Sequence, residues 1–168
     1  MLVVFSGLPG TGKTTLAMQL ARQTGAVYLR IDTIEQAIRD SGDFHQPVGR
    51  SGYRVATALA LTHLRLGHRV IADGVNPVAE SRTAWHDAAS SADAVLLDIE
   101  VVCSNTHEHR RRVQARASDI PGLNPPTWQS VVEHEYEPCV EPVLRIDTGC
   151  VSAEEAVALI VERIGLAA

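Results

Sequence analysis

Residues 7–14 of this chain read Gly7-Leu8-Pro9-Gly10-Thr11-Gly12-Lys13-Thr14. They fit the pattern G-x-x-x-x-G-K-[ST] at every fixed position. The apolar run 2–5 before them is typical of a buried strand, and apolar residues recur at helical spacing afterwards, up to about Thr24. Strand, glycine-rich loop and helix are the order in which backbone N–H groups and a helix N-terminus surround a phosphate. The sequence therefore predicts a site for a nucleoside triphosphate.

The residues of this loop have separate expected roles. Lys13 should reach the β- and γ-phosphates, and the hydroxyl of Thr14 should ligate Mg²⁺. A glycine-rich turn that binds nothing is the alternative. The expected nucleotide contacts of the loop are Gly7, Leu8, Pro9, Gly10, Thr11, Gly12, Lys13, Thr14 and Thr15.

Length and composition indicate a single domain over residues 1–168. The net charge of −5 offers no general basic surface for nucleic acid. No apolar run approaches the roughly 20 residues that span a bilayer, and the N-terminal run lacks a basic leader, so we expect neither a membrane partner nor a signal peptide. Three widely spaced cysteines without a CxxC pair favour a reducing compartment, the cytoplasm.

Strand-like and helix-like segments alternate along the rest of the chain. Further strands are expected at 26–31, 69–73, 94–102 and 143–147. Further helices are expected at 33–40, 53–66, 77–90, 106–117, 127–136 and from 153 onward, with a polar loop around 41–49. The last helix should open with the capping box Ser152-Ala153-Glu154-Glu155 and bury Ala156, Leu159, Ile160 and Ile164. Such alternation calls for a parallel sheet with right-handed crossovers.

Acidic residues stand at the ends of two expected strands. Ligands bind beyond the carboxyl ends of parallel strands, so Asp32 and Asp73 should lie beside the phosphate loop. A carboxylate there can accept a proton from an attacking hydroxyl or hold Mg²⁺. Asp32 is the candidate base and Asp73 the candidate metal ligand, and an exchange of these roles stays open. Alternatively, Asp32 caps its helix and Asp73 forms a turn with Gly74.

The segment 104–126 combines a basic helix with a proline-rich loop. Arg112 and Arg116 are four residues apart and would share one helix face. Two such cations can stabilise a transferring phosphoryl group, and the loop can close as a lid. A solvated basic face is the alternative. Nearby, Cys103, His107 and His109 match no standard zinc spacing, so we expect surface histidines there.

Together these stretches resemble the P-loop small-substrate kinases of the AAA-domain-like type. This group includes chloramphenicol phosphotransferase, polynucleotide kinase, zeta toxin, and the gluconate and adenylylsulfate kinases. The stretches that carry the resemblance are 7–14, Ile31-Asp32-Thr33-Ile34, Val70-Ile71-Ala72-Asp73, Arg112-x-x-x-Arg116 and Ile146-Asp147-Thr148. The resemblance covers essentially the whole chain. It implies an α/β P-loop NTPase three-layer sandwich: a five-stranded parallel sheet in the order 2-3-1-4-5, helices on both faces, and a helical lid at about 104–126.

The resemblance also implies residue roles. It places the general base or hydroxyl ligand at Asp32, the lid arginines at Arg112 and Arg116, and an adenine contact at Thr148. The acceptor pocket would be built from residues 32–54 and 76–82. Glu35 stands where polynucleotide kinases carry an arginine, which disfavours a nucleic-acid substrate.

The leading hypothesis is therefore an ATP- and Mg²⁺-dependent phosphotransferase, a kinase that phosphorylates a hydroxyl of a small molecule. A 5′-hydroxyl polynucleotide kinase and a nucleotide-dependent regulatory ATPase are the alternatives. The chain has no Asn-Lys-x-Asp motif for guanine, which favours ATP over GTP. We expect a monomer or homodimer, and the sequence leaves the identity of the acceptor open.

Overall fold

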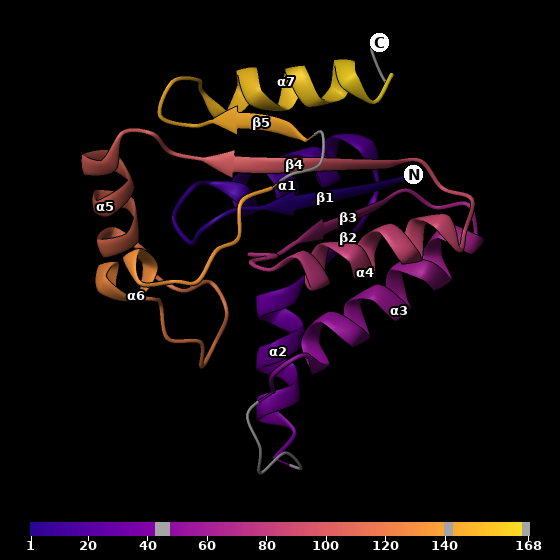
Figure 1. The fold of residues 1–168 in the computed structure, drawn as a ribbon, viewed down its shortest axis with the longest axis horizontal. Helices are drawn as coiled ribbons and strands as arrows, with labels where there is room; N and C mark the ends of the chain where they lie inside the picture. The colour runs from indigo at the N-terminus through magenta and orange to yellow at the C-terminus, as the bar shows by residue number, and fades with distance from the viewer. Residues whose placement is uncertain (43–47, 140–142, 166–168) are drawn as a thin grey trace.

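The computed structural model describes residues 1–42, 48–139 and 143–165. Its centre is a five-stranded, all-parallel sheet in the order β2-β3-β1-β4-β5 (Figure 1). The strands are β1 (Leu2–Ser6), β2 (Val27–Arg30), β3 (Val70–Asp73), β4 (Leu96–Val102) and β5 (Leu144–Asp147). The predicted sheet and its strand order are confirmed. Residues 43–47 of the expected polar loop lie outside the described residues.

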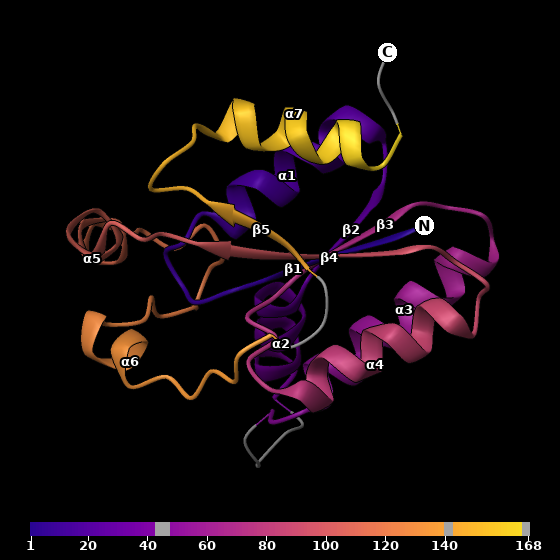
Figure 2. The same ribbon diagram turned by 45° about the horizontal axis from the view of Figure 1, so that its top comes forward.

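Helices cover both faces of the sheet, as the turned view in Figure 2 shows. On one face lie α1 (Lys13–Thr24) and α7 (Ala153–Arg163), and on the other lie α2 (Ile31–Asp40), α3 (Ser51–Arg65) and α4 (Ala79–Ser90). Two further helices, α5 (Thr106–Ala115) and α6 (Trp128–Val132), lie beyond the carboxyl end of β4. The predicted three layers are therefore present, with α5 and α6 outside them.

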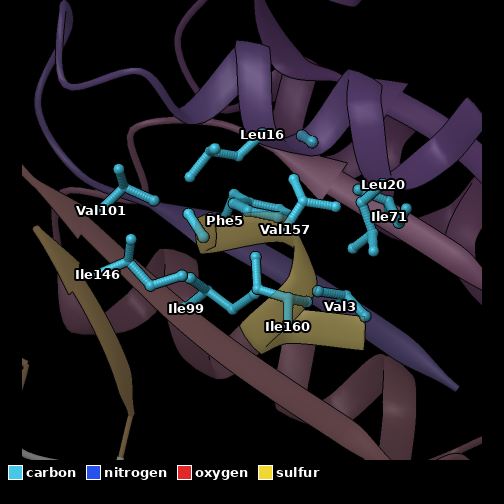
Figure 3. Packing of buried hydrophobic residues seen from close by; sticks show 12 residues of the cluster. Val3, Phe5, Leu16, Leu20, Ile71, Ile99, Val101, Ile146, Val157 and Ile160 are labelled. Atoms are coloured by element: carbon cyan, nitrogen blue, oxygen red, sulfur yellow. The ribbon is translucent and has the colours of Figure 1, made fainter. Parts of the chain in front are cut away.

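Strand β1 is buried along its whole length because it separates two apolar cores. Successive side chains of a strand point to opposite faces. Val3 and Phe5 accordingly pack with α1 and α7 (Figure 3), whereas Leu2 and Val4 pack with α3 and α4. Burial on both sides fixes the strand firmly, and with it the start of the phosphate loop.

The last helix carries the predicted capping box. The Ser152 side chain accepts a hydrogen bond from the Glu155 backbone, and the Glu155 side chain accepts one from Ser152. The prediction that Leu159 lies on the inner face of this helix was wrong: Leu159 is 48% exposed, and Val157 is buried instead. Helix α7 packs on α1 through Ala156, Val157 and Ile160, so this neighbour sets its inner face.

Several element boundaries differ from the expectation; α6, for example, ends at Val132 and not near residue 136, and two of the differences matter for the site. Helix α2 begins at Ile31 with Arg30 as its N-cap, so Asp32 lies inside the first turn and does not cap the helix. Helix α5 ends at Ala115, and Arg116 follows as an extended C-cap residue. Helix α4 begins at Ala79, two residues after Pro77. Among the described residues, no helix has both the length and the apolar character needed to cross a bilayer.

Candidate active site

The sheet register brings the predicted site residues to one edge of the molecule. Asp73 of β3 lies opposite Phe5 of β1 and Arg30 of β2. The phosphate loop, the start of α2 and the end of β3 therefore meet. Between them lies a hollow of about 220 Å³, which we call the acid-lined hollow. Its charged and metal-binding candidates are Lys13, Thr14, Asp32, Asp73 and Arg116.

The phosphate loop presents an uncapped helix end. Gly12 precedes α1 with φ +98°, and no side chain caps the first turn of this helix. The free N–H groups there are suited to an anion. At the other end of the loop, Gly7 has φ +134°, and a Cβ atom there would overlap the carbonyl oxygen of Val101. The backbone path of the loop therefore requires glycine at position 7.

Lys13 is buried between the loop and the two acids. Its side chain is 7% exposed, and Nζ donates a hydrogen bond to the Leu8 carbonyl oxygen at 3.0 Å. Burial lowers the pKa of Lys13, and the charges of Asp73 and Asp32 oppose this shift. A phosphate beside Nζ would offset the same burial cost.

The two acids occupy different environments. Asp73 is 3% exposed, and its Oδ2 accepts a hydrogen bond from the Tyr28 hydroxyl at 2.7 Å. Burial and the neighbouring Asp73 carboxylate raise the pKa of Tyr28, so this phenol stays a donor. The side chain of Asp32 is 39% exposed, and its Oδ2 lies 3.8 Å from guanidinium nitrogens of both Arg30 and Arg116. Asp73 is thus fixed, while Asp32 is accessible to an incoming molecule.

The hollow contains suitable ligands for Mg²⁺. The Thr14 hydroxyl and the Asp73 carboxylate both line it, and Mg²⁺ prefers such oxygen ligands. Tyr28 engages Oδ2 of Asp73, and within the described part of the chain Oδ1 has no hydrogen-bond partner. Mg²⁺ usually takes one or two protein ligands plus waters and substrate phosphates. Within the described residues, no group of three or more His, Cys, Asp or Glu lies together in a way that could hold a metal.

Arg112 and Arg116 do not share a helix face, contrary to the expectation from their spacing. Arg112 donates to Oγ1 and the carbonyl oxygen of Thr148 at 2.8 and 3.1 Å, and to Glu108 at 2.8 Å. The Thr148 hydroxyl in turn donates to the Thr11 carbonyl at 2.7 Å. Arg112 therefore ties α5 to the phosphate loop through Thr148, whereas Arg116, beyond the helix end, faces Asp32.

A second hollow also has Lys13 in its lining. It measures about 500 Å³, and we call it the arginine-lined hollow. Among the described residues, its charged lining groups are five cations and one acid: Lys13, Arg30, Arg111, Arg112, Arg116 and Asp119. Such an excess of cations beside an uncapped helix end is suited to a triphosphate. The two hollows share Lys13, Thr14 and Arg116.

Sequence reasoning missed two residues that shape this site. Arg30 is 6% exposed, and its two terminal nitrogens bind Asp119 at 2.7 and 3.0 Å, which ties the segment 104–126 to β2. His109, expected at the surface, is 8% exposed and bonds through Nε2 to the Pro9 carbonyl at 2.8 Å. Because a carbonyl only accepts, Nε2 carries the hydrogen. His109 lies one turn before the apolar Val113, a spacing that places both on one face.

Comparison with known proteins agrees with this geometry. A family model described as an AAA domain matches residues 2–123. No curated protein matches the chain.

Solved structures match the chain over nearly its whole length. The APS kinase of Mycobacterium tuberculosis in complex with AMPPNP and APS is 20% identical, with a TM-score of 0.73 and coverage of 98% of this chain and 96% of that one. A sugar kinase from Janibacter sp. HTCC2649 is 16% identical, with a TM-score of 0.72 and coverage of 99% and 95%. A gluconokinase from Sinorhizobium meliloti 1021 is 18% identical, with a TM-score of 0.62 and coverage of 97% and 94%. These similarities establish the P-loop NTPase α/β fold.

Proposed function

Because the chain belongs to the AAA-domain family, we propose that it is an ATP- and Mg²⁺-dependent phosphotransferase, a kinase acting on a hydroxyl group of a small molecule. The observation that carries this proposal is the meeting of the two hollows at Lys13, Thr14 and Arg116. One hollow is rich in cations and suits a triphosphate. The other contains two carboxylates and suits a hydroxyl group. A γ-phosphate at the junction would be accessible from both.

Asp32 is the proposed base. The hydroxyl oxygen of the acceptor bonds to the γ-phosphorus while Asp32 accepts the hydroxyl proton, and the bond to the bridging oxygen breaks to release ADP. The exposure of Asp32 favours this role over Asp73, which is buried and held by Tyr28. Lys13 and Arg116 stabilise the charge on the transferring group.

The nucleotide is held by loop residues 7–15, with Thr148 placed between this loop and Arg112. Thr14 and Asp73 would hold Mg²⁺, which when bound neutralises charge on the β- and γ-phosphates. The segment 104–126 acts as a lid, because Arg112 and Arg116 line the arginine-lined hollow while the loop residues 123–126 line the acid-lined hollow. Closure of such a segment excludes water from the transfer.

The environment of Glu35 argues against a nucleic-acid end as acceptor. Glu35 lies in α2 with Asp32, and its carboxylate binds Arg39 at 3.1 Å. A phosphate on the substrate would be repelled by these acids. The Arg39 side chain is already engaged with Glu35, so it offers no free cation to compensate.

Transfer of labelled γ-phosphate from ATP with Mg²⁺ tests this proposal. The acceptor panel contains aminoglycosides, chloramphenicol, nucleosides, sugars, adenylylsulfate and a 5′-hydroxyl oligonucleotide. A labelled small-molecule product that is absent with Lys13→Ala, but present with Arg163→Ala, is the expected result. Arg163 lies near the end of α7, and neither hollow includes it. Label on the oligonucleotide alone, or only as inorganic phosphate with every acceptor, would contradict the proposal.

A further inference from the structure

The acid-lined hollow has walls of two kinds. Its acidic residues are Asp32, in the first turn of α2, and Asp73, at the end of β3. Its apolar lining residues include Val75 after β3 and Leu123, Pro125 and Pro126 of the segment 104–126, and we call these residues its apolar side. A molecule in this hollow therefore meets carboxylates together with apolar surface.

The cations of this hollow are shared with the nucleotide. Among the described residues that line it, only Lys13 and Arg116 are basic, and both also line the arginine-lined hollow. Lys13 and Arg116 are the groups that the γ-phosphate would engage. Once they are taken by phosphate, and Asp73 by Mg²⁺ as proposed above, the charge left for the acceptor is the Asp32 carboxylate.

Two nearby arginines are also occupied. Arg30 directs both terminal nitrogens to Asp119, as described above. Arg82 donates to the carbonyl oxygens of Asn76 and Glu137, each at 3.1 Å. Neither guanidinium is a lining group of the acid-lined hollow. An anionic group on the acceptor would therefore lie beside Asp32 without a cation of its own.

We propose that the phosphate acceptor is an alcohol that carries no negatively charged group and has an apolar part. This inference rests on the proposed function and names its substrate class. A neutral alcohol uses its hydroxyl at Asp32 and its apolar part against Leu123 and the prolines. An amino alcohol gains in addition from attraction between its ammonium group and the Asp32 carboxylate. A carboxylate, sulfate or phosphate on the acceptor is repelled, and repulsion between like charges is strong where water is excluded.

Three hydroxyl compounds of similar size test the charge dependence: 1-phenylethane-1,2-diol, 2-amino-1-phenylethanol and mandelate. Each contains a phenyl group and a hydroxyl, and they differ in charge. We would measure transfer of labelled γ-phosphate, and binding to the protein loaded with Mg²⁺ and AMPPNP. The diol and the amino alcohol should exceed mandelate by roughly tenfold or more in kcat/KM or affinity. Transfer to mandelate or gluconate at rates equal to the diol would overturn the inference and leave the proposed function standing. Absence of transfer and binding for the three compounds would overturn the inference, and only failure of every small-molecule acceptor of the panel above as well would overturn the proposed function.

A charge added to the apolar side tests the same inference from the protein. Leu123→Lys should shift the preference towards mandelate by roughly tenfold, because it supplies the missing cation. Val132→Lys is the matched control, since Val132 is 60% exposed on α6 and does not line the hollow. Stabilisation by ADP in a thermal shift reports that each variant is folded. If Leu123→Lys fails to fold, Asn124→Lys, at an exposed position of the same hollow, replaces it. An unchanged preference in the folded variant overturns the inference.

Discussion

Substitution of Gly10 by alanine tests how the phosphate loop is held by α5. Gly10 has φ +83°, and a Cβ atom there would overlap Cγ2 of Val113 and approach the His109 ring. Val113 is buried, and His109 is bonded to the loop at Pro9, so neither neighbour can move away freely. We therefore expect Gly10→Ala to destabilise the protein by backbone strain and by overlap together.

The two contributions can be separated with a matched glycine. Gly67 has nearly the same backbone angle, φ +82°, but a Cβ atom there would meet nothing within 4 Å. Gly67→Ala should cost only the left-handed strain, roughly 1–2 kcal/mol. Gly10→Ala adds the overlap with Val113, about 1–3 kcal/mol. For a domain of this size each kcal/mol lowers Tm by roughly 2–4 °C. The expected difference in Tm between the two variants is therefore about 2–12 °C.

Urea unfolding followed by circular dichroism measures these free energies. Adding Val113→Ala to Gly10→Ala removes the overlapping methyl groups, so the double variant should lose less free energy of unfolding than the sum of the single variants. The shortfall should be about 1–3 kcal/mol. Equal losses for Gly10→Ala and Gly67→Ala, or additive losses in the double variant, would refute the packing of α5 on the phosphate loop.

Three further predictions concern the charged groups of the site. Tyr28→Phe removes the hydrogen bond to Asp73, so the Mg²⁺ concentration for half-maximal transfer should rise about tenfold; an unchanged Mg²⁺ titration would contradict this. Arg116→Ala should lower kcat by roughly 10–100-fold with little change in ATP affinity. Unchanged kinetics would show that Arg116 takes no part in the transfer and is only a solvent-exposed cation. Hydrogen bonds from Arg30 lower the pKa of Asp119 in the folded protein. The pair therefore stabilises the fold fully at pH values above the ordinary aspartate pKa of about 3.9. This contribution is lost as the pH falls through the lowered pKa of the folded state. The difference in Tm between wild type and Asp119→Asn should therefore be present at neutral pH and shrink in acid, and a difference independent of pH would disprove it.

The parts of the fold that sequence predicted are those with local physical causes. Strand β1 is a continuous apolar run because it is buried on both faces. The loop pattern at 7–14 needs glycine at the positions where φ is positive, including Gly7 and Gly12. The capping box at Ser152 likewise depends only on residues three positions apart.

The errors arose where distant segments decide the outcome. Arg116 leaves the helix and faces Asp32, which is far away in sequence, and no helical spacing could show this. Arg30 is buried by its pairing with Asp119, a contact between residues 89 positions apart. His109 is buried because α5 packs against the phosphate loop, although its spacing from Val113 gave a usable signal.

The most direct test of the central claim compares ATP binding with phosphate transfer in Asp32→Asn. The substitution keeps the size of the side chain and removes its ability to accept a proton. The proposed site predicts nearly unchanged affinity for ATP and a loss of transfer of roughly 100-fold or more, since a general base contributes about 10²–10⁴-fold. Wild-type transfer by Asp32→Asn would contradict the claim that Asp32 is the base at the junction of the two hollows.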